Sequence, residues 1–232
     1  IPLQHRTGNG YVYASDFISD DDAAATLLAN LDGKALAEPR PLRFVTGKRR
    51  KQWHRNCVAI GLASGFLEPL ESTSIHLVQS SISRLLALLP GKVIRDADRD
   101  EYNRQADFEF ERIRDFIILH YKANGRTGEP LWDYCRNMSI PDTLAAKIEL
   151  FQASGRIFRE HEELFTEAGW AQVLIGQGGQ AASQHPRADA ISDADLGDYL
   201  GKLRTVVARG AATLPGHADF IAGFCRAPSV EA

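Results

Sequence analysis

The chain has 232 residues, of which 44% are hydrophobic and 25% charged, so it can bury a sizeable core and lacks the composition of a disordered protein. Its net charge of −3 is small and spread along the sequence, which argues against nucleic-acid binding. No apolar run approaches the roughly 20 residues that span a bilayer, and the first residues do not form the basic and apolar regions of a secretory leader. We therefore expect a cytoplasmic protein without a membrane partner.

The cysteines and histidines do not form a metal-binding pattern. Cys57, Cys135 and Cys225 lie far apart and lack C-x-x-C spacing, which argues against a disulfide framework or a zinc site. The seven histidines also lack metal-ligand spacing. We expect reduced cysteines and no bound metal.

Strand-like segments occur only in the first 60 residues, at positions 10–13, 42–45 and 57–60. A helix is expected between the first two of these segments, because apolar residues recur at helical spacing over 24–31 before Gly33. Asp20 or Asp21 can cap its start.

A second helix is expected to begin near Ser72 and to end at Pro90 and Gly91. Its apolar positions form one stripe that we expect to be buried and to fix the direction of the helix start: Ile75, Val78, Ile82, Leu85, Leu86 and Leu89.

The rest of the chain is predicted to be mainly helical. Apolar stripes of helical spacing lie within 113–121, 144–151, 160–173 and 196–207, and Ser192 or Asp193 can cap the last helix. The segment 176–190, rich in Gly, Ala, Ser and Gln, is expected to be a long loop. The predicted fold class is therefore mixed α/β, with few N-terminal strands followed by a mainly helical part.

The segment 56–76 combines a strand, a glycine-bearing loop and a helix start. The first backbone N–H groups of a helix have no partner within it, and the helix dipole places partial positive charge there. This corner is therefore suited to bind an anion. Glu71 stands at the corner as a possible acid, base or hydrogen-bond anchor, although by itself it is typical of an ordinary acidic residue at a helix start.

This segment resembles the chloride and flavin loop of flavin-dependent halogenases of the tryptophan halogenase family. The resemblance runs from Trp53 through Asn56-Cys57-Val58-Ala59-Ile60-Gly61-Leu62 to Gly65-Phe66-Leu67-Glu68-Pro69-Leu70-Glu71-Ser72-Thr73. The opening Ile1-Pro2 and Arg6-Thr7-Gly8-Asn9-Gly10-Tyr11-Val12-Tyr13 resemble the end of the family's Trp-x-Trp-x-Ile-Pro signature and the segment directly after it. The chain thus resembles the C-terminal half of such an enzyme, part of an FAD-binding, flavin monooxygenase-like fold.

The family's N-terminal part carries a G-x-G-x-x-G turn for the FAD pyrophosphate and an essential lysine, and this sequence has no counterpart of either. The resemblance therefore implies a missing N-terminal half as a partner. It also implies reduced FAD supplied by a separate flavin reductase, with chloride or bromide as the halide.

The resemblance assigns roles to individual residues of the loop. Glu71 matches the catalytic glutamate, and the backbone N–H groups of Thr73 and Ser74 match the halide site, where the family usually has glycine at position 74. The matching cofactor-binding positions are Leu62, Ile75, Gly61, Gly65 and Pro69. Glu68 matches a structural position of the loop.

The implied substrate is a small electron-rich aromatic molecule such as an indole. The substrate residues of tryptophan-specific members have no match here, whereas Trp170-Ala171-Gln172-Val173, Gly176-Gln177-Gly178 and His185-Pro186 resemble members with other aromatic substrates. Residues 1–90 would then be a mixed strand and helix portion facing flavin and halide, and 91–232 a helical portion covering the substrate. These portions are not expected to be independent domains.

Two other functions stay open at this point. The chain could be a noncatalytic helical scaffold, which would fold alone, bind no flavin and tolerate Glu71→Gln. It could also belong to a related flavin monooxygenase, which would hydroxylate its substrate without halide.

Some polar residues are expected to have ordinary roles. We predict that His76 is a helix-face residue rather than a proton carrier, because nothing nearby in the sequence marks a partner. The pairs Glu109/Glu111 and Glu162/Glu163 are predicted to belong to solvated helix faces. Trp53 and Trp170 are predicted to be core or pocket-wall residues.

Overall fold

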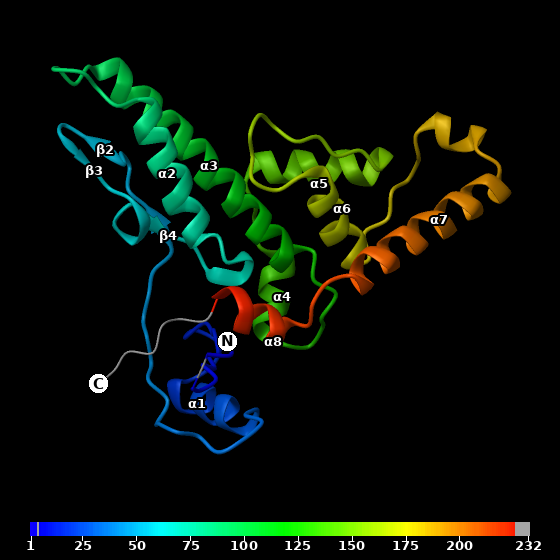
Figure 1. Ribbon diagram of the computed structural model, residues 1–232, viewed down its shortest axis with the longest axis horizontal. Coiled ribbons are helices and arrows are strands. Elements are labelled where there is room, and N and C mark those ends of the chain that lie inside the picture. The colour runs from blue at the N-terminus through cyan, green and yellow to red at the C-terminus, as the bar shows by residue number, and fades with distance from the viewer. Residues whose placement is uncertain (4, 226–232) are drawn as a thin grey trace. The chain divides into compact units, whose positions relative to one another are not determined.

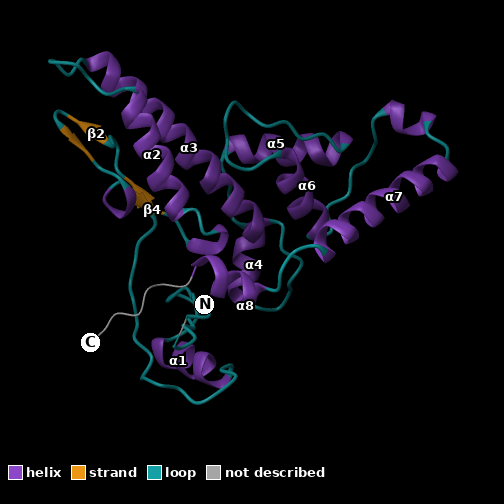
Figure 2. Ribbon diagram, viewed as in Figure 1, coloured by secondary structure: helices purple, strands orange, loops and turns teal. Residues whose placement is uncertain are grey.

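The computed structural model describes residues 1–3 and 5–225, and these form a mixed but mainly helical fold (Figures 1 and 2). The α-helices are α1 Asp20–Ala29, α2 Ser74–Ala87, α3 Asp96–Lys122, α4 Pro130–Asn137, α5 Asp142–Ser154, α6 Glu167–Gly176, α7 Asp193–Ala212 and α8 His217–Phe220. The short helical turns are η1 Gly61–Ala63, η2 Pro69–Glu71, η3 Pro186–Ala190 and η4 Ile221–Cys225. The strands are β1 Gly47–Lys48, β2 Trp53–His54, β3 Cys57–Val58 and β4 Gly65–Phe66. The predicted fold class is confirmed.

The strands form two small antiparallel pairs rather than one sheet. β1 pairs with β4, with Gly47 opposite Phe66, and β2 pairs with β3, with Trp53 opposite Val58. The predicted strands at 10–13 and 42–45 are wrong, because neither segment has a strand partner among the described residues. A strand needs the hydrogen bonds of a neighbour, which propensity alone does not supply. The predicted buried strand at 57–60 is reduced to β3, whose Cys57 is exposed.

Helix α3 is the centre of the packed part. It contacts α2, α4, α5, α6 and β2. Its side chains from Tyr102 to Leu119 contribute to three apolar clusters, which contain Trp53, Tyr102 and Ala106; Leu77, Phe110, Ile113 and Ile117; and Phe116, Leu119, Leu144, Phe151, Trp170 and Leu174. The predicted burial of Trp53 and Trp170 is confirmed.

Helix α2 forms where the sequence predicts it, but the predicted burial of its apolar stripe holds for only part of the stripe. Leu77 and Ser81 are its buried residues, whereas Ile75 is 81% exposed and Leu86 66% exposed. The described contacts of α2 lie with α3 and η1. Val78 and Leu85 of the stripe are half-buried, Val78 beside Gly61 and Leu85 against the cluster of Trp53 and Tyr102, whereas the other four stripe residues are exposed.

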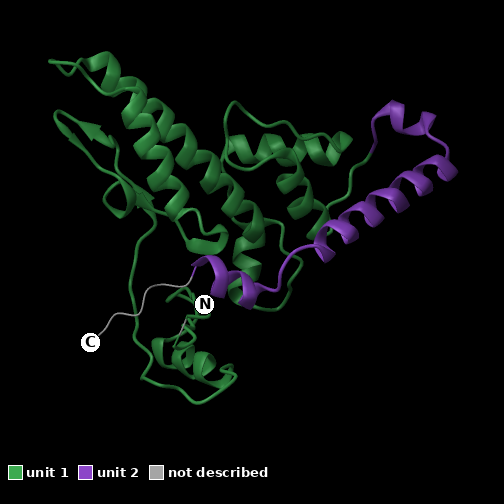
Figure 3. Ribbon diagram, in the orientation of Figure 1, with its two compact units in different colours: residues 1–182 green, residues 183–232 purple. Residues whose placement is uncertain are grey.

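Contacts divide the chain into two units, residues 1–182 and 183–232 (Figure 3). The second unit contains α7, which Ser192 caps as predicted by accepting a hydrogen bond from the Asp195 amide. Helix α1 also forms as predicted, but its cap is Ser19 rather than Asp20 or Asp21. The assignment of a flavin and halide-facing portion at 1–90 and a substrate-covering portion at 91–232 stays a prediction.

Over the described residues, no helix has the length and apolar character needed to cross a bilayer.

Candidate functional site

The loop that leads into α2 is built on two glycines that a larger residue could not replace without movement. Gly61 has φ +64°, and a Cβ there would lie 3.1 Å from Val78 Cγ2 of α2. At Gly65 a Cβ would lie 2.6 Å from the Gly47 carbonyl oxygen, because β1 and β4 approach closely. Ser64 closes the turn by donating its hydroxyl to the Gly61 carbonyl oxygen at 2.7 Å. The loop is therefore held tightly against the first turns of α2.

The start of α2 leaves backbone donors available. Thr73 precedes the helix without a side-chain cap, and its carbonyl accepts from the Leu77 amide at 2.9 Å. Within the part of the chain that the structure describes, neither the Thr73 nor the Ser74 amide donates to a protein acceptor. Ser72, just before them, has the left-handed φ of +53°, which is uncommon for a residue other than glycine. The corner predicted from the sequence therefore has two neighbouring N–H groups without a protein acceptor at a helix start, with Thr73 buried and Ser74 exposed in this chain.

Glu71 lies beside His120 of α3. Its Oε1 is 2.8 Å from His120 Nε2, and the two side chains are 31% and 18% exposed. The other ring nitrogen of His120, Nδ1, is 2.8 Å from the Phe116 carbonyl oxygen. Sequence reasoning missed this partner, because the two residues stand far apart in the chain and only the fold brings them together.

The neighbouring carboxylate, Glu68, is also held by α3. The Tyr121 hydroxyl donates to Glu68 Oε2 at 2.9 Å. Burial of the phenol and its bond to Glu68 raise the pKa of Tyr121 above its ordinary value. The Tyr121 ring also stacks on Trp132 of α4, with ring centroids 5.8 Å apart. Glu68 therefore ties the loop to α3.

A polar cluster fixes α2 against α3. Glu109 of α3 lies 2.9 Å from His76 Nε2, and it accepts from the Ser80 hydroxyl at 2.9 Å and from Arg84 Nη2 at 2.7 Å. His76 lies on a face of α2 and finds a partner that the sequence did not mark, whereas the predicted solvated role of Glu109 is wrong, since its side chain is 13% exposed. This contact could not be read from the sequence because α2 and α3 are separate helices. The cluster orients the helix whose start carries the free amides.

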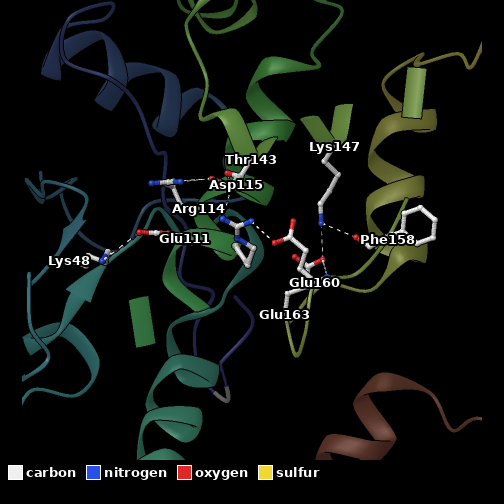
Figure 4. A network of polar contacts seen from close by, with 10 residues as sticks. Lys48, Glu111, Arg114, Asp115, Thr143, Lys147, Phe158, Glu160 and Glu163 are labelled. Carbon is white, nitrogen blue, oxygen red and sulfur yellow. Dashed lines mark hydrogen bonds and ion pairs between the residues drawn. The ribbon is translucent and has the colours of Figure 1, made fainter. Parts of the chain in front are cut away.

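A second polar network lies among α3, α5 and the segment before α6 (Figure 4). Arg112 binds Glu160 at 2.9 Å, and Asp115 accepts from the Thr143 hydroxyl at 2.6 Å. Lys147 Nζ donates to Glu163 Oε1 at 2.8 Å. Glu163 is 1% exposed, so its predicted place on a solvated face is wrong. These paired charges serve the packing of the helices.

The predicted cofactor positions lie in this loop and in the first turn of α2. Gly61 and Leu62 belong to η1, which contacts α2, and Pro69 opens η2 beside Glu71. The side chains of Leu62 and Ile75 are 77% and 81% exposed, so both are accessible to a ligand. Over the described residues, no group of three or more potential metal ligands occurs.

The sequence of this chain is similar to that of halogenases. The family model described as tryptophan halogenase matches residues 1–193. The curated 7-chloro-L-tryptophan 6-halogenase KtzR of Kutzneria sp. (strain 744) is 34% identical over 231 residues, which cover 96% of this chain and 44% of KtzR.

Two solved structures are similar over nearly the whole chain. Xcc4156, a flavin-dependent halogenase from Xanthomonas campestris, gives a TM-score of 0.89 at 48% identity, and the match covers 94% of this chain and 44% of Xcc4156. BrvH, a flavin-dependent halogenase from Brevundimonas sp. BAL3, gives a TM-score of 0.90 at 47% identity, and the match covers 96% of this chain and 45% of BrvH. The chain thus spans less than half the length of these relatives.

Proposed function

Because this chain belongs to the tryptophan halogenase family, we propose that it forms the C-terminal part of an FAD-dependent halogenase that oxidatively halogenates an electron-rich aromatic substrate. The observation that carries the proposal is the pair of unpaired amides, Thr73 and Ser74, at the start of α2 and close after Glu71. Such a helix start is suited to hold a halide, since its donors are neutral and aligned with the helix dipole.

Thr73 and Ser74 would bind chloride or bromide through their backbone N–H groups. Serine at position 74 can replace the family's usual glycine, because a backbone donor makes the contact and Ser74 adopts ordinary helical geometry as the first residue of α2.

Gly61, Leu62, Gly65, Pro69 and Ile75 would form the flavin side of the site. The close packing of Gly61 on Val78 leaves no room for a side chain, and the exposed Leu62 and Ile75 offer apolar contact and backbone to a ring edge. These residues therefore fit the edge of a flavin. Reduced FAD, when bound, supplies the oxygen chemistry that oxidises the halide.

Glu71 would act at the substrate. Its carboxylate can orient the halogenating species and can accept the proton that the aromatic carbon loses when the carbon–halogen bond forms. The contact with His120 at 2.8 Å holds this carboxylate in a defined position, which supports the role.

The remaining requirements lie outside this chain. The proposal includes the family's N-terminal half as the carrier of the FAD pyrophosphate site and the lysine, a separate reductase for FAD, and an indole-like substrate rather than free tryptophan. We place the protein in the cytoplasm, where the free Cys57, Cys135 and Cys225 would stay reduced.

The test uses the chain joined to the rest of a family member's length. Reduced FAD, oxygen and a panel of indoles and phenols are supplied with and without chloride or bromide, and products are identified by mass spectrometry. Halogenated product that requires halide is expected. Hydroxylated product that forms equally without halide would contradict the proposal and indicate a monooxygenase.

Glu71→Gln tests the catalytic assignment in the same assay. We expect turnover to fall by about 100-fold or more, because proton transfer to a positioned group contributes on the order of 10² to 10⁴. The matched control is Glu68→Gln, which can still accept the Tyr121 hydroxyl and should change turnover by less than about threefold, since a hydrogen bond to a neutral acceptor is retained. Full halogenation by Glu71→Gln would show that the assignment is wrong.

A further inference from the structure

We propose that His120 is the positioning residue for Glu71: it holds a proton against Oε1 of this carboxylate and so leaves Oε2 as the oxygen that faces the reaction. This inference rests on the proposed function of Glu71. The inference is based on the contacts of the two ring nitrogens of His120. Nε2 lies 2.8 Å from Glu71 Oε1, and Nδ1 lies 2.8 Å from the Phe116 carbonyl oxygen.

The Phe116 carbonyl sets the protonation of the imidazole ring. A carbonyl oxygen can only accept a hydrogen bond, so Nδ1 of His120 must carry a proton. In a neutral ring with that tautomer, Nε2 has a lone pair, and an ionised Glu71 would face it with another lone pair. Two lone pairs repel at 2.8 Å, so a second proton must lie between the two residues.

The surroundings of His120 keep the ring in one orientation. The ring packs edge-on against the Phe116 ring, with centroids 4.9 Å apart. Phe116 in turn stacks on Phe165 at 3.8 Å and meets Trp170 at 4.9 Å, in the largest apolar cluster. His120 therefore rests on a buried part of α3 rather than on a mobile loop.

The second carboxylate oxygen of Glu71 has no protein partner of its own. Within the described residues, Glu71 Oε2 takes part in no hydrogen bond or ion pair, whereas Oε1 faces His120 Nε2.

The consequence for the reaction is geometric. A carboxylate that can rotate presents either oxygen, whereas a carboxylate with one oxygen paired to a fixed imidazole presents a single oxygen in one direction. Loss of this restraint would lower the rate of the chemical step more than it would weaken substrate binding.

The experiment is a kinetic comparison of variants in the complete halogenase, that is, the chain joined to the rest of a family member's length. His120→Ala should lower kcat by about 10- to 100-fold, since misplacement of a reacting group by about 1 Å can cost 100-fold, while KM for the aromatic substrate stays within about twofold. His120→Gln should recover most of this loss, because its amide can donate to Oε1. Tyr121→Phe is the matched control on the next residue of α3, and it should change kcat by less than about threefold because it frees Glu68 and not Glu71.

A double variant separates positioning from general damage to the fold. If His120 acts through Glu71, then His120→Ala should not slow an enzyme that already carries Glu71→Gln. The inference would be overturned by an equal loss of kcat in both backgrounds or by an unchanged kcat in His120→Ala. It would also be overturned if His120→Gln failed to recover activity while Tyr121→Phe stayed active. Wild-type enzyme without halide-dependent activity would instead overturn the proposed function.

Discussion

Helices α3 and α2 both carry apolar stripes at helical spacing, but the fold uses them differently. Helix α3 is surrounded by α2, α4, α5, α6 and β2, and its buried residues include Phe116 and Leu119. Helix α2 meets α3 and η1, and its predicted stripe stays largely exposed. An apolar stripe therefore predicts that a helix forms, whereas its burial depends on which partners the chain provides. The start of α2 is also the one that follows the glycine-bearing loop and Glu71.

The largest expected effect tests the packed side of this comparison. Trp170 of α6 is buried against Phe116 of α3, and Lys147 lies over its ring at 4.3 Å. Trp170→Ala should lower the free energy of unfolding by about 3–5 kcal/mol, because it leaves a large cavity in the main cluster. Urea unfolding followed by circular dichroism measures this. Ile175→Ala, at an exposed position of the same helix, is the control and should change the value by less than about 0.5 kcal/mol.

The two faces of α2 provide the second test. Leu77 packs on Phe110, Ile113 and Ile117 of α3, so Leu77→Ala should lower the free energy of unfolding by about 2–5 kcal/mol. Ile75→Ala, on the exposed face, should change it by less than about 0.5 kcal/mol in this chain. Equal effects from both substitutions, measured by the same unfolding experiment, would show that the stripe of α2 is covered after all.

The third test concerns the loop that holds the start of α2. Gly65→Ala places a methyl group 2.6 Å from the Gly47 carbonyl oxygen, so β1 and β4 must separate. Overpacking of this kind should lower the free energy of unfolding by about 1–3 kcal/mol. Gly10→Ala meets no atom within 4 Å and serves as the control. Thermal unfolding of the two variants compares them directly, and similar melting temperatures would contradict the expected crowding.

The smallest expected effect is a gain. Ser72 has φ +53°, and a left-handed conformation costs about 1–2 kcal/mol for residues with a Cβ. Glycine removes this strain but loses about 0.5–1 kcal/mol through its greater freedom in the unfolded chain. Ser72→Gly should therefore raise the free energy of unfolding by up to about 1.5 kcal/mol. A loss of stability in a denaturant titration would mean that the serine side chain makes a contribution larger than the strain.

The sequence predicted the elements that depend on local signals. Helix α2 begins close to the expected Ser72, Ser192 caps α7, and Trp53 and Trp170 are in the core as expected. The helix start after a glycine-bearing loop was also predictable, because it depends on the order of local signals along the chain. These features need only a few consecutive residues.

The features that could not be predicted depend on contacts between distant parts of the chain. Glu71 with His120, and Glu109 with His76, are brought together by the packing of α3 beside the loop and beside α2. The burial of Glu163 likewise requires Lys147 from another element. The sequence predicted more strand than the structure contains, because β-propensity reports only that side chains suit a sheet surface and not that a partner strand is present. In the structure each strand pairs over two residues.

The hold of α3 on the loop has a mechanical consequence. His120 and Tyr121 are consecutive, so their side chains leave the helix axis about 100° apart, yet one meets Glu71 and the other Glu68. Each acidic residue of the loop therefore has its own partner on the last turns of α3. Any twist of the last turn of α3 would therefore be transmitted to the loop as a rotation of the whole segment, with both acidic side chains moving together.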